Sequence, residues 1–137
     1  MGQIGSLGEI VFEVSGEKIQ TFKDMKRSSS ARVATHEILG QKPMLEFIGP
    51  GLEDITFNIK LSQSLGVDID DSLEKLRSMR DEGKIEFFIV AGEPVTDNKW
   101  LVLSLSEATN YTDGTGKALS VDVDVALKEY VEDQEVM

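Results

Sequence analysis

Two stretches of this chain alternate strictly between apolar and polar residues, and this pattern constrains the fold more than any other feature of the sequence. In KALSVDVDVALKEYV every second residue from Leu119 to Leu127 is apolar, and in EDITFNIKLS the same holds from Ile55 to Leu61. A period of two places these side chains on one face of a β-strand, whereas a helix would scatter the valines around its axis. Both stretches are predicted to be strands with one buried face and one solvent-exposed face.

Other apolar runs add further strands. Turn-forming residues separate them, among them Gly40, Gly49-Pro50-Gly51 as a stop, and Asp113-Gly114. The predicted strands are GEIVFEVS, KIQTF, ARVATHEIL, PMLEFIG, residues 85–90 and residues 100–107. About eight strands, mostly antiparallel, are expected.

One segment, DIDDSLEKLRSMRDEGK, has helical periodicity. Its apolar residues recur every three positions, at Leu73, Leu76 and Met79. Asp70 or Asp71 is expected to cap the helix, and Gly83 to end it. One amphipathic helix of three turns is predicted.

The expected fold class is therefore mainly β (α+β), an antiparallel β-sandwich or barrel with one packed helix. The 137 residues suit a single domain. We assign residues 1–131 to this domain and residues 132–137, EDQEVM, to a flexible acidic tail. The longest apolar runs are far shorter than the roughly 20 residues that span a bilayer, so no membrane anchor is expected.

The charge of the chain excludes one class of function. The net charge is −11. All of the negative excess lies after residue 36, because the first 36 residues carry five basic and four acidic groups. Binding to duplex DNA requires clustered Lys and Arg, so a gene regulator is not expected. An acidic surface suits a protein past which nucleic acid slides without binding. The absence of cysteine predicts folding in the cytoplasm.

Three consecutive serines precede the only histidine of the chain, in KRSSSARVATHE. A serine nucleophile requires a base within hydrogen-bond reach and an oxyanion hole, typically at a G-x-S-x-G turn. The chain has no such motif, and His36 falls in a strand pattern with Ala34 and Ile38 on the same face. We predict no catalytic residues, and expect His36 to make a local hydrogen bond or to face a partner.

Acidic residues raise the question of a metal site. DIDDSLEKL lacks the spacing of an EF-hand calcium loop and is better explained by helix capping. Asp122 and Asp124 alternate with valines, which predicts a face open to solvent or to a lumen. The scattered glycines form no phosphate loop. No metal ligand, cofactor site or cofactor is predicted.

KDMKRSSSAR is the only basic patch of the sequence, with Lys23, Lys26, Arg27 and Arg32 against Asp24. By itself it is typical of a mobile hairpin tip. The alternative is that it docks onto an acidic neighbouring subunit. On the second interpretation the subunit interface comprises Lys23, Lys26, Arg27, Ser28, Ser29, Ser30, Arg32 and His36.

Beyond these local patterns, most of the chain resembles one family. The segments MGQIGSLGEIVFEVS, KRSSSARVATHEILGQKPMLEFIGPGLEDITFNIKLSQSLGVD, LEKLRSM, LSLSE and LSVDVDVALKEYV are similar, in this order, to the tail protein U family of contractile-tailed bacteriophages and phage-tail-like particles. The resemblance implies a virion or tail-assembly protein without enzymatic activity. It also implies the tail-tube fold.

Gene order in this family implies a position near the baseplate end. The expected protein is then a hexameric ring that initiates the tube, with Asp122 and Asp124 facing the lumen. Its expected partners are the central hub, LysM-type tail, tail-tube and tape-measure proteins, with DNA passing through the ring unbound. The sequence leaves three alternatives open: a tail terminator at the head-proximal end, a small cell-wall hydrolase, and a monomeric binding module for a non-phage partner.

Overall fold

The structure, a computed structural model, describes residues 3–8, 10–14, 19–20, 22–63, 66 and 68–132. Its main sheet contains five antiparallel strands in the spatial order β4, β7, β12, β11, β8. Their bounds are β4 (Phe22–Ser28), β7 (Asp54–Ser62), β8 (Ile85–Glu86), β11 (Lys99–Thr112) and β12 (Ala118–Tyr130). Both strictly alternating stretches are strands, as predicted, and they pair with each other along their lengths.

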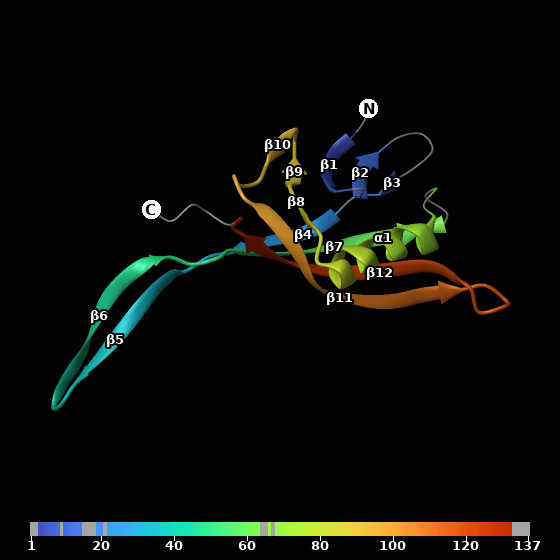
Figure 1. Ribbon diagram of the computed structural model, residues 1–137. Coiled ribbons are helices and arrows are strands. Elements are labelled where there is room, and N and C mark those ends of the chain that lie inside the picture. Colours follow the sequence, from blue (N-terminus) through green and yellow to red (C-terminus); the bar gives the residue numbers. More distant parts are fainter. Residues whose placement is uncertain are drawn as a thin grey trace.

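A second antiparallel sheet lies on one side of the main sheet, together with the helix (Figure 1). Its strands follow the order β10, β9, β1, β2, β3. Their bounds are β1 (Gln3–Leu7), β2 (Ile10–Val14), β3 (Ile19–Gln20), β9 (Phe88–Val90) and β10 (Glu93–Pro94). The mainly β fold with one helix is thus confirmed for the described residues.

Helix α1 spans Ile69–Glu82, one turn longer than the three turns predicted. The Asp68 side chain accepts a hydrogen bond from the amide of Asp71 and so caps the helix. The prediction of Asp70 or Asp71 as the cap was therefore wrong, because the helix begins earlier and both lie in its first turn. Gly83 adopts the left-handed conformation and ends the helix as predicted.

Among the described residues, one apolar core fills the space between the main sheet, the second sheet and α1. The alternating residues of β7 and β12 supply one wall, and Leu73, Leu76 and Met79 of α1 supply another. Phe57 of the main sheet stacks on Phe88 of the second sheet, with ring centroids 5.3 Å apart. The opposite face of the main sheet, here called the outer face, carries Asp122 and Asp124.

Beyond the body, β5 (Ala31–Ile38) and β6 (Gln41–Pro50) form a separate two-stranded hairpin, here called the arm. The arm prolongs β4 and β7 at one end of the molecule and curves away from the side that holds α1 (Figure 1). The basic segment was expected at a hairpin tip, but the tip lies at Leu39-Gly40. Most of the segment instead forms β4, because its backbone pairs with β7.

Two boundaries differ from the prediction. Strand β11 continues past 107 to Thr112, because β12 offers a pairing partner along this whole length. The predicted strand at residues 85–90 divides into β8 and β9, which belong to different sheets. The predicted stop at Gly49-Pro50-Gly51 is confirmed, because β6 ends at Pro50. Residues 133–137 of the predicted acidic tail lie outside the described residues. Within the described part of the chain, no helix is long and apolar enough to cross a membrane.

Candidate assembly surfaces

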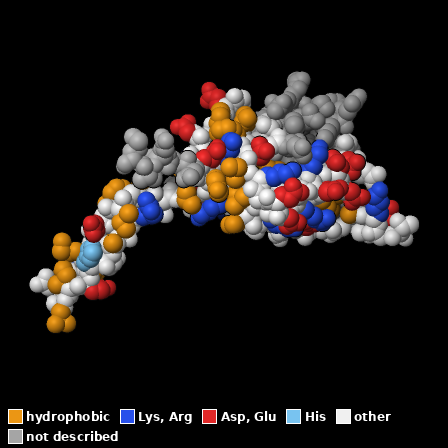
Figure 2. All heavy atoms as spheres, in the orientation of Figure 1, with side chains coloured by type: hydrophobic (Ala, Val, Ile, Leu, Met, Phe, Trp, Pro, Cys, Tyr) orange, Lys and Arg blue, Asp and Glu red, His pale blue; other side chains and the backbone are white. Residues whose placement is uncertain are grey.

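The arm exposes large apolar side chains beyond the core. Strand register places Val33 opposite Phe47 and Thr35 opposite Leu45, so these side chains share one face. Val33, Leu45 and Phe47 are 47%, 67% and 70% exposed, and we call these three residues the apolar arm face. Figure 2 shows hydrophobic side chains gathered along the arm. Exposed apolar clusters of this kind mark surfaces that bind another molecule.

The opposite face of the arm is more polar. Ala34 lies opposite Glu46, and His36 lies opposite Met44. His36 Nε2 and Glu46 Oε1 are 2.9 Å apart, which satisfies the imidazole within the chain. The local hydrogen bond expected for His36 is therefore present. The arm is amphipathic, and its apolar arm face is the one with the stronger tendency to be buried.

Several hydrogen bonds hold the base of the arm against the body. Arg27 of β4 forms a two-point ion pair with Glu53, through Nε and through Nη2 at 3.1 Å. The Glu53 amide donates to Glu129 Oε1 at 3.0 Å, and Asn98 Nδ2 donates to Glu129 Oε2 at 2.8 Å. The Gly51 amide donates to the Ser30 carbonyl at 2.9 Å. These bonds fix the direction in which the arm leaves the sheet.

The Arg27–Glu53 pair makes stability depend on pH. The hydrogen bond from Arg27 lowers the pKa of Glu53 below its ordinary value. A glutamate pKa that is lower in the folded than in the unfolded state contributes stability above the unfolded value of about 4.3, which is lost as the pH falls through the folded value. Because both side chains are partly exposed, the contribution is at most about 1 kcal/mol.

We expect Glu53→Gln to lower the free energy of unfolding at pH 7 by up to about 1 kcal/mol. The difference from the wild type should shrink toward zero as the pH falls below the unfolded value of about 4.3 and through the lowered folded value, where Glu53 becomes protonated. Urea unfolding at a series of pH values measures this. Glu93→Gln, at an exposed position of the second sheet, is the matched control and should leave the curve unchanged. A pH-independent effect of Glu53→Gln would contradict the assignment.

The outer face brings together two groups of residues that the sequence analysis had treated separately. Lys23 and Lys26 of β4 line a hollow of about 340 Å³ that also contains Asp122 and Asp124 of β12. Asn58 Nδ2 donates to Asp124 at 2.9 Å, and Asn110 Nδ2 donates to Asp122 at 2.8 Å. The aspartates thus form part of a polar network across strands, with lysines at the adjacent sheet edge.

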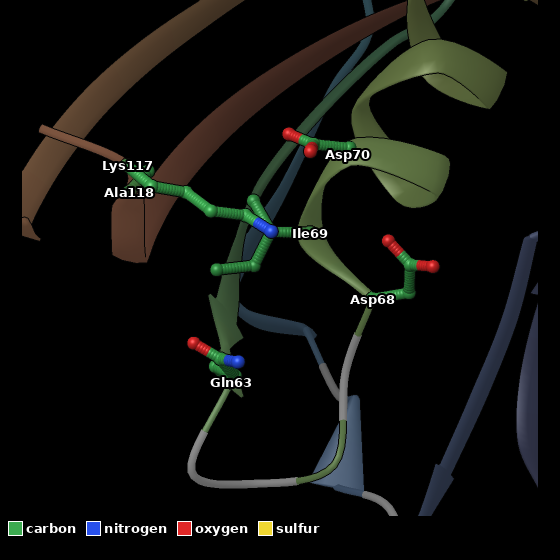
Figure 3. A pocket seen from close by; sticks show the side chains of 6 residues that line it. All are labelled: Gln63, Asp68, Ile69, Asp70, Lys117 and Ala118. Atoms are coloured by element: carbon green, nitrogen blue, oxygen red, sulfur yellow. The ribbon is translucent and has the colours of Figure 1, made fainter. Parts of the chain in front are cut away.

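A second hollow, of about 300 Å³, lies between the start of α1 and the start of β12 (Figure 3). Its lining includes Asp68, Asp70 and Lys117. Asp68 already serves as the helix cap, so its carboxylate has a structural role. Among the described residues, no cluster of three or more acidic or histidine side chains has the arrangement of a metal site.

The main sheet has an open edge on each side. Strand β4 pairs only with β7 in the described part of the chain, and its outer edge carries Lys23 and Lys26. On the other side, β8 pairs with β11 only at Trp100 and Leu101, so the described residues leave the β11 edge open from 102 onward. Open edges are templates for pairing with a strand of another chain.

The serines and the histidine of the predicted interface lie at different places along the arm. Ser28 ends β4, Ser29 and Ser30 link it to β5, and His36 lies five residues beyond Ala31. An extended strand rises about 3.3 Å per residue, so Ala31 and His36 are about 16 Å apart. The fold therefore does not bring Ser28, Ser29 or Ser30 into hydrogen-bond reach of His36 of the same chain.

The predicted interface residues Arg27 and Arg32 also have partners in the chain. Arg27 is held by Glu53, and Arg32 Nε donates to the Pro50 carbonyl at 3.2 Å. Lys23 and Lys26 lie on the outer face of β4, beside its open edge.

The apolar arm face is the surface that the sequence analysis missed. The sequence did contain an indication of it, because apolar residues occupy both odd and even positions of β6, at Met44, Leu45, Phe47 and Ile48.

Comparisons with known proteins agree with this architecture. A search of curated proteins found no match. Among solved structures, the chain is similar to a chain in the tail of an empty GTA particle, determined with helical refinement and C6 symmetry. The TM-score is 0.50 at 12% identity, over 99% of this chain and 96% of that chain, which is a likeness of fold. The model of the Phage P2 GpU family matches residues 8–132, and the chain therefore belongs to this family, as its resemblance to tail protein U predicted.

Proposed function

We propose that this protein is a structural component of a contractile phage tail or tail-like particle, and that it acts by assembly without catalysis. Six copies form a ring at the baseplate end of the tail, where the ring links the central hub to the tube and initiates tube growth. The observation that carries this proposal is the arm. Its exposed apolar side chains, Val33, Leu45 and Phe47, favour burial against another chain.

The two open edges of the main sheet support the ring. If β4 of one copy pairs with the exposed length of β11 in the next, the sheet continues from copy to copy. Such a head-to-tail contact uses two different surfaces and closes into a ring when the rotation fits. The lysines on the β4 edge favour a neighbour whose net charge is strongly negative, which this chain supplies.

The outer face is proposed to line the lumen of the ring. Its exposed carboxylate Asp124 and its partly exposed carboxylate Asp122 give it acidic character, and Lys60 lies beside them in register. Phosphate groups passing such a surface meet carboxylates interspersed with Lys23, Lys26 and Lys60, so positive charge is not clustered enough to retain them. The similarity of fold to a tail component with C6 symmetry supports six copies.

The placement at the baseplate end rests on the gene order typical of the family. The hub, LysM-type tail, tail-tube and tape-measure proteins are the partners that this placement implies. Electron microscopy of particles that carry a tagged copy tests it directly. A label at the baseplate end supports the initiator role. A label at the head-proximal end would instead identify a tail terminator.

The ring itself is tested by measuring the mass of the purified protein with light scattering, alone and mixed with the hub protein. A ring appears as about six times the 15.1 kDa mass of the chain. A species of that size in either sample supports the proposal. A monomer in both samples, even at high concentration, would contradict it and favour a monomeric binding module.

A further inference from the structure

We infer that the apolar arm face of one copy docks into a groove at the opposite end of the main sheet in a second copy of this chain. This inference rests on the assembly proposed above, and it names the surface that receives the arm. The groove, here called the distal groove, lies near the β11–β12 turn. Its lining residues are Lys60, Ser62, Gln63, Tyr111, Leu119 and Ser120.

The distal groove is hollow, partly apolar and incompletely satisfied. It has a volume of about 490 Å³, and the Tyr111 side chain on its rim is 69% exposed. Ser120 is only 5% exposed, yet its hydroxyl has no hydrogen-bond partner among the described residues. This hydroxyl is closed to solvent, so Ser120 forms part of the groove floor, and the accessible contacts are left to Tyr111, Leu119 and Lys60.

Strand register places the groove on the outer face of the main sheet. Ser120 lies opposite both Ser62 and Tyr111, and two residues further along β12 is Asp122. Because side chains alternate along a strand, these residues share the face that α1 does not cover. The groove is therefore open to a chain approaching from the outer side.

The arm and the groove lie at opposite ends of the same sheet. The arm leaves one end and curves away from the side that holds α1, and the β11–β12 turn lies at the other end (Figure 1). A neighbouring copy in the ring whose strands are also shifted along their own direction would therefore bring its arm to the distal end of the outer face of the first, where the groove lies. The contact joins two different surfaces of one chain, so it repeats from copy to copy.

The charge and polarity of the arm also match those of the distal groove. Alternation along β5 places Val33, Thr35 and Glu37 on the same side of the arm. A carboxylate toward the arm tip complements Lys60 in the groove. A register shift between Tyr111 and Thr112 interrupts the alternation at Leu119, which therefore lines the groove and not the core. The apolar side chains of the arm complement Tyr111 and Leu119. A second copy therefore offers the arm both an apolar partner and an opposite charge.

The chain contains no cysteine, so engineered cysteines report this contact without background. The double variant Phe47→Cys/Tyr111→Cys carries one thiol on the apolar arm face and one on the groove rim. Under mild oxidation it should form disulfide-linked chains longer than a dimer on a non-reducing gel. Either single variant should stop at a dimer. Both positions are exposed, so folding is preserved.

The matched control is Met44→Cys/Tyr111→Cys, because Met44 is also exposed but lies on the opposite face of the arm. We expect the Phe47 pair to form at least ten times more trimer and longer products than the Met44 pair. Light scattering of the reduced samples reads the assembly independently.

Two results would overturn the inference in distinguishable ways. If reduced samples form rings but both cysteine pairs cross-link equally, or neither does, the arm docks elsewhere and the ring proposal stands. If the reduced samples are monomeric, the docking inference and the ring proposal both fail.

Discussion

Phe47→Asp is expected to abolish ring formation while leaving the fold of the monomer intact. Phe47 is 70% exposed in the isolated chain, so aspartate costs little there. In an assembly that buries this side chain, the substitution loses about 1.5–3 kcal/mol of apolar burial at each contact and buries a charge as well. That is a loss of about 10-fold to 150-fold in affinity per contact, repeated around the ring.

Light scattering over a range of protein concentrations measures the loss, and circular dichroism checks that the monomer is folded. Met44→Asp is the matched control, since it introduces the same charge on the other face of the arm. The control should weaken assembly much less. Rings of unchanged mass and stability from Phe47→Asp would show that the apolar arm face takes no part in the assembly.

Phe88→Ala is expected to destabilise the folded chain by about 3–5 kcal/mol. Phe88 is fully buried where the two sheets meet, stacked on Phe57 and edge-on to Phe22 at 5.8 Å between centroids. Removing its ring leaves a cavity that rigid strands on both sides cannot fill. Since single domains are stable by only about 5–15 kcal/mol, much of the total is lost.

The midpoint of urea unfolding measures this effect, and the neighbouring residue supplies the control. Phe87 is partly exposed, with Lys99 Nζ 5.5 Å from its ring centroid. Phe87→Ala should therefore cost about 1 kcal/mol or less. Equal effects at the two positions would mean that Phe88 does not join the sheets as described.

The parts of the fold that could be predicted from sequence are those whose burial is decided within the chain. In β7 and β12 the alternation indicates a face turned toward the core, and both strands were predicted correctly. The exception is Leu119, which was expected on the core face and instead lines the distal groove. In β6 the apolar residues Met44, Leu45, Phe47 and Ile48 follow no single face. Such a pattern gives no indication of where the strand lies, because its burial depends on another chain.

The placement of the basic segment illustrates a second limit. Its charges indicated an interface, but Arg27 bonds to Glu53, a residue 26 positions further along the chain. A pair of this kind depends on the register between β4 and β7, and local composition carries no information about it. The hollow that Lys23 and Lys26 line together with Asp122 and Asp124 is equally non-local.

The arm also governs how this protein must be produced. A free monomer carries an unpaired hairpin with apolar side chains, which is a template for irregular aggregation. The body counters this with a net charge of −11, which keeps monomers apart at long range. Salt shortens the range of that repulsion but leaves the apolar attraction in place. The ionic strength during purification therefore sets the balance between a dispersed stock, orderly rings and precipitate.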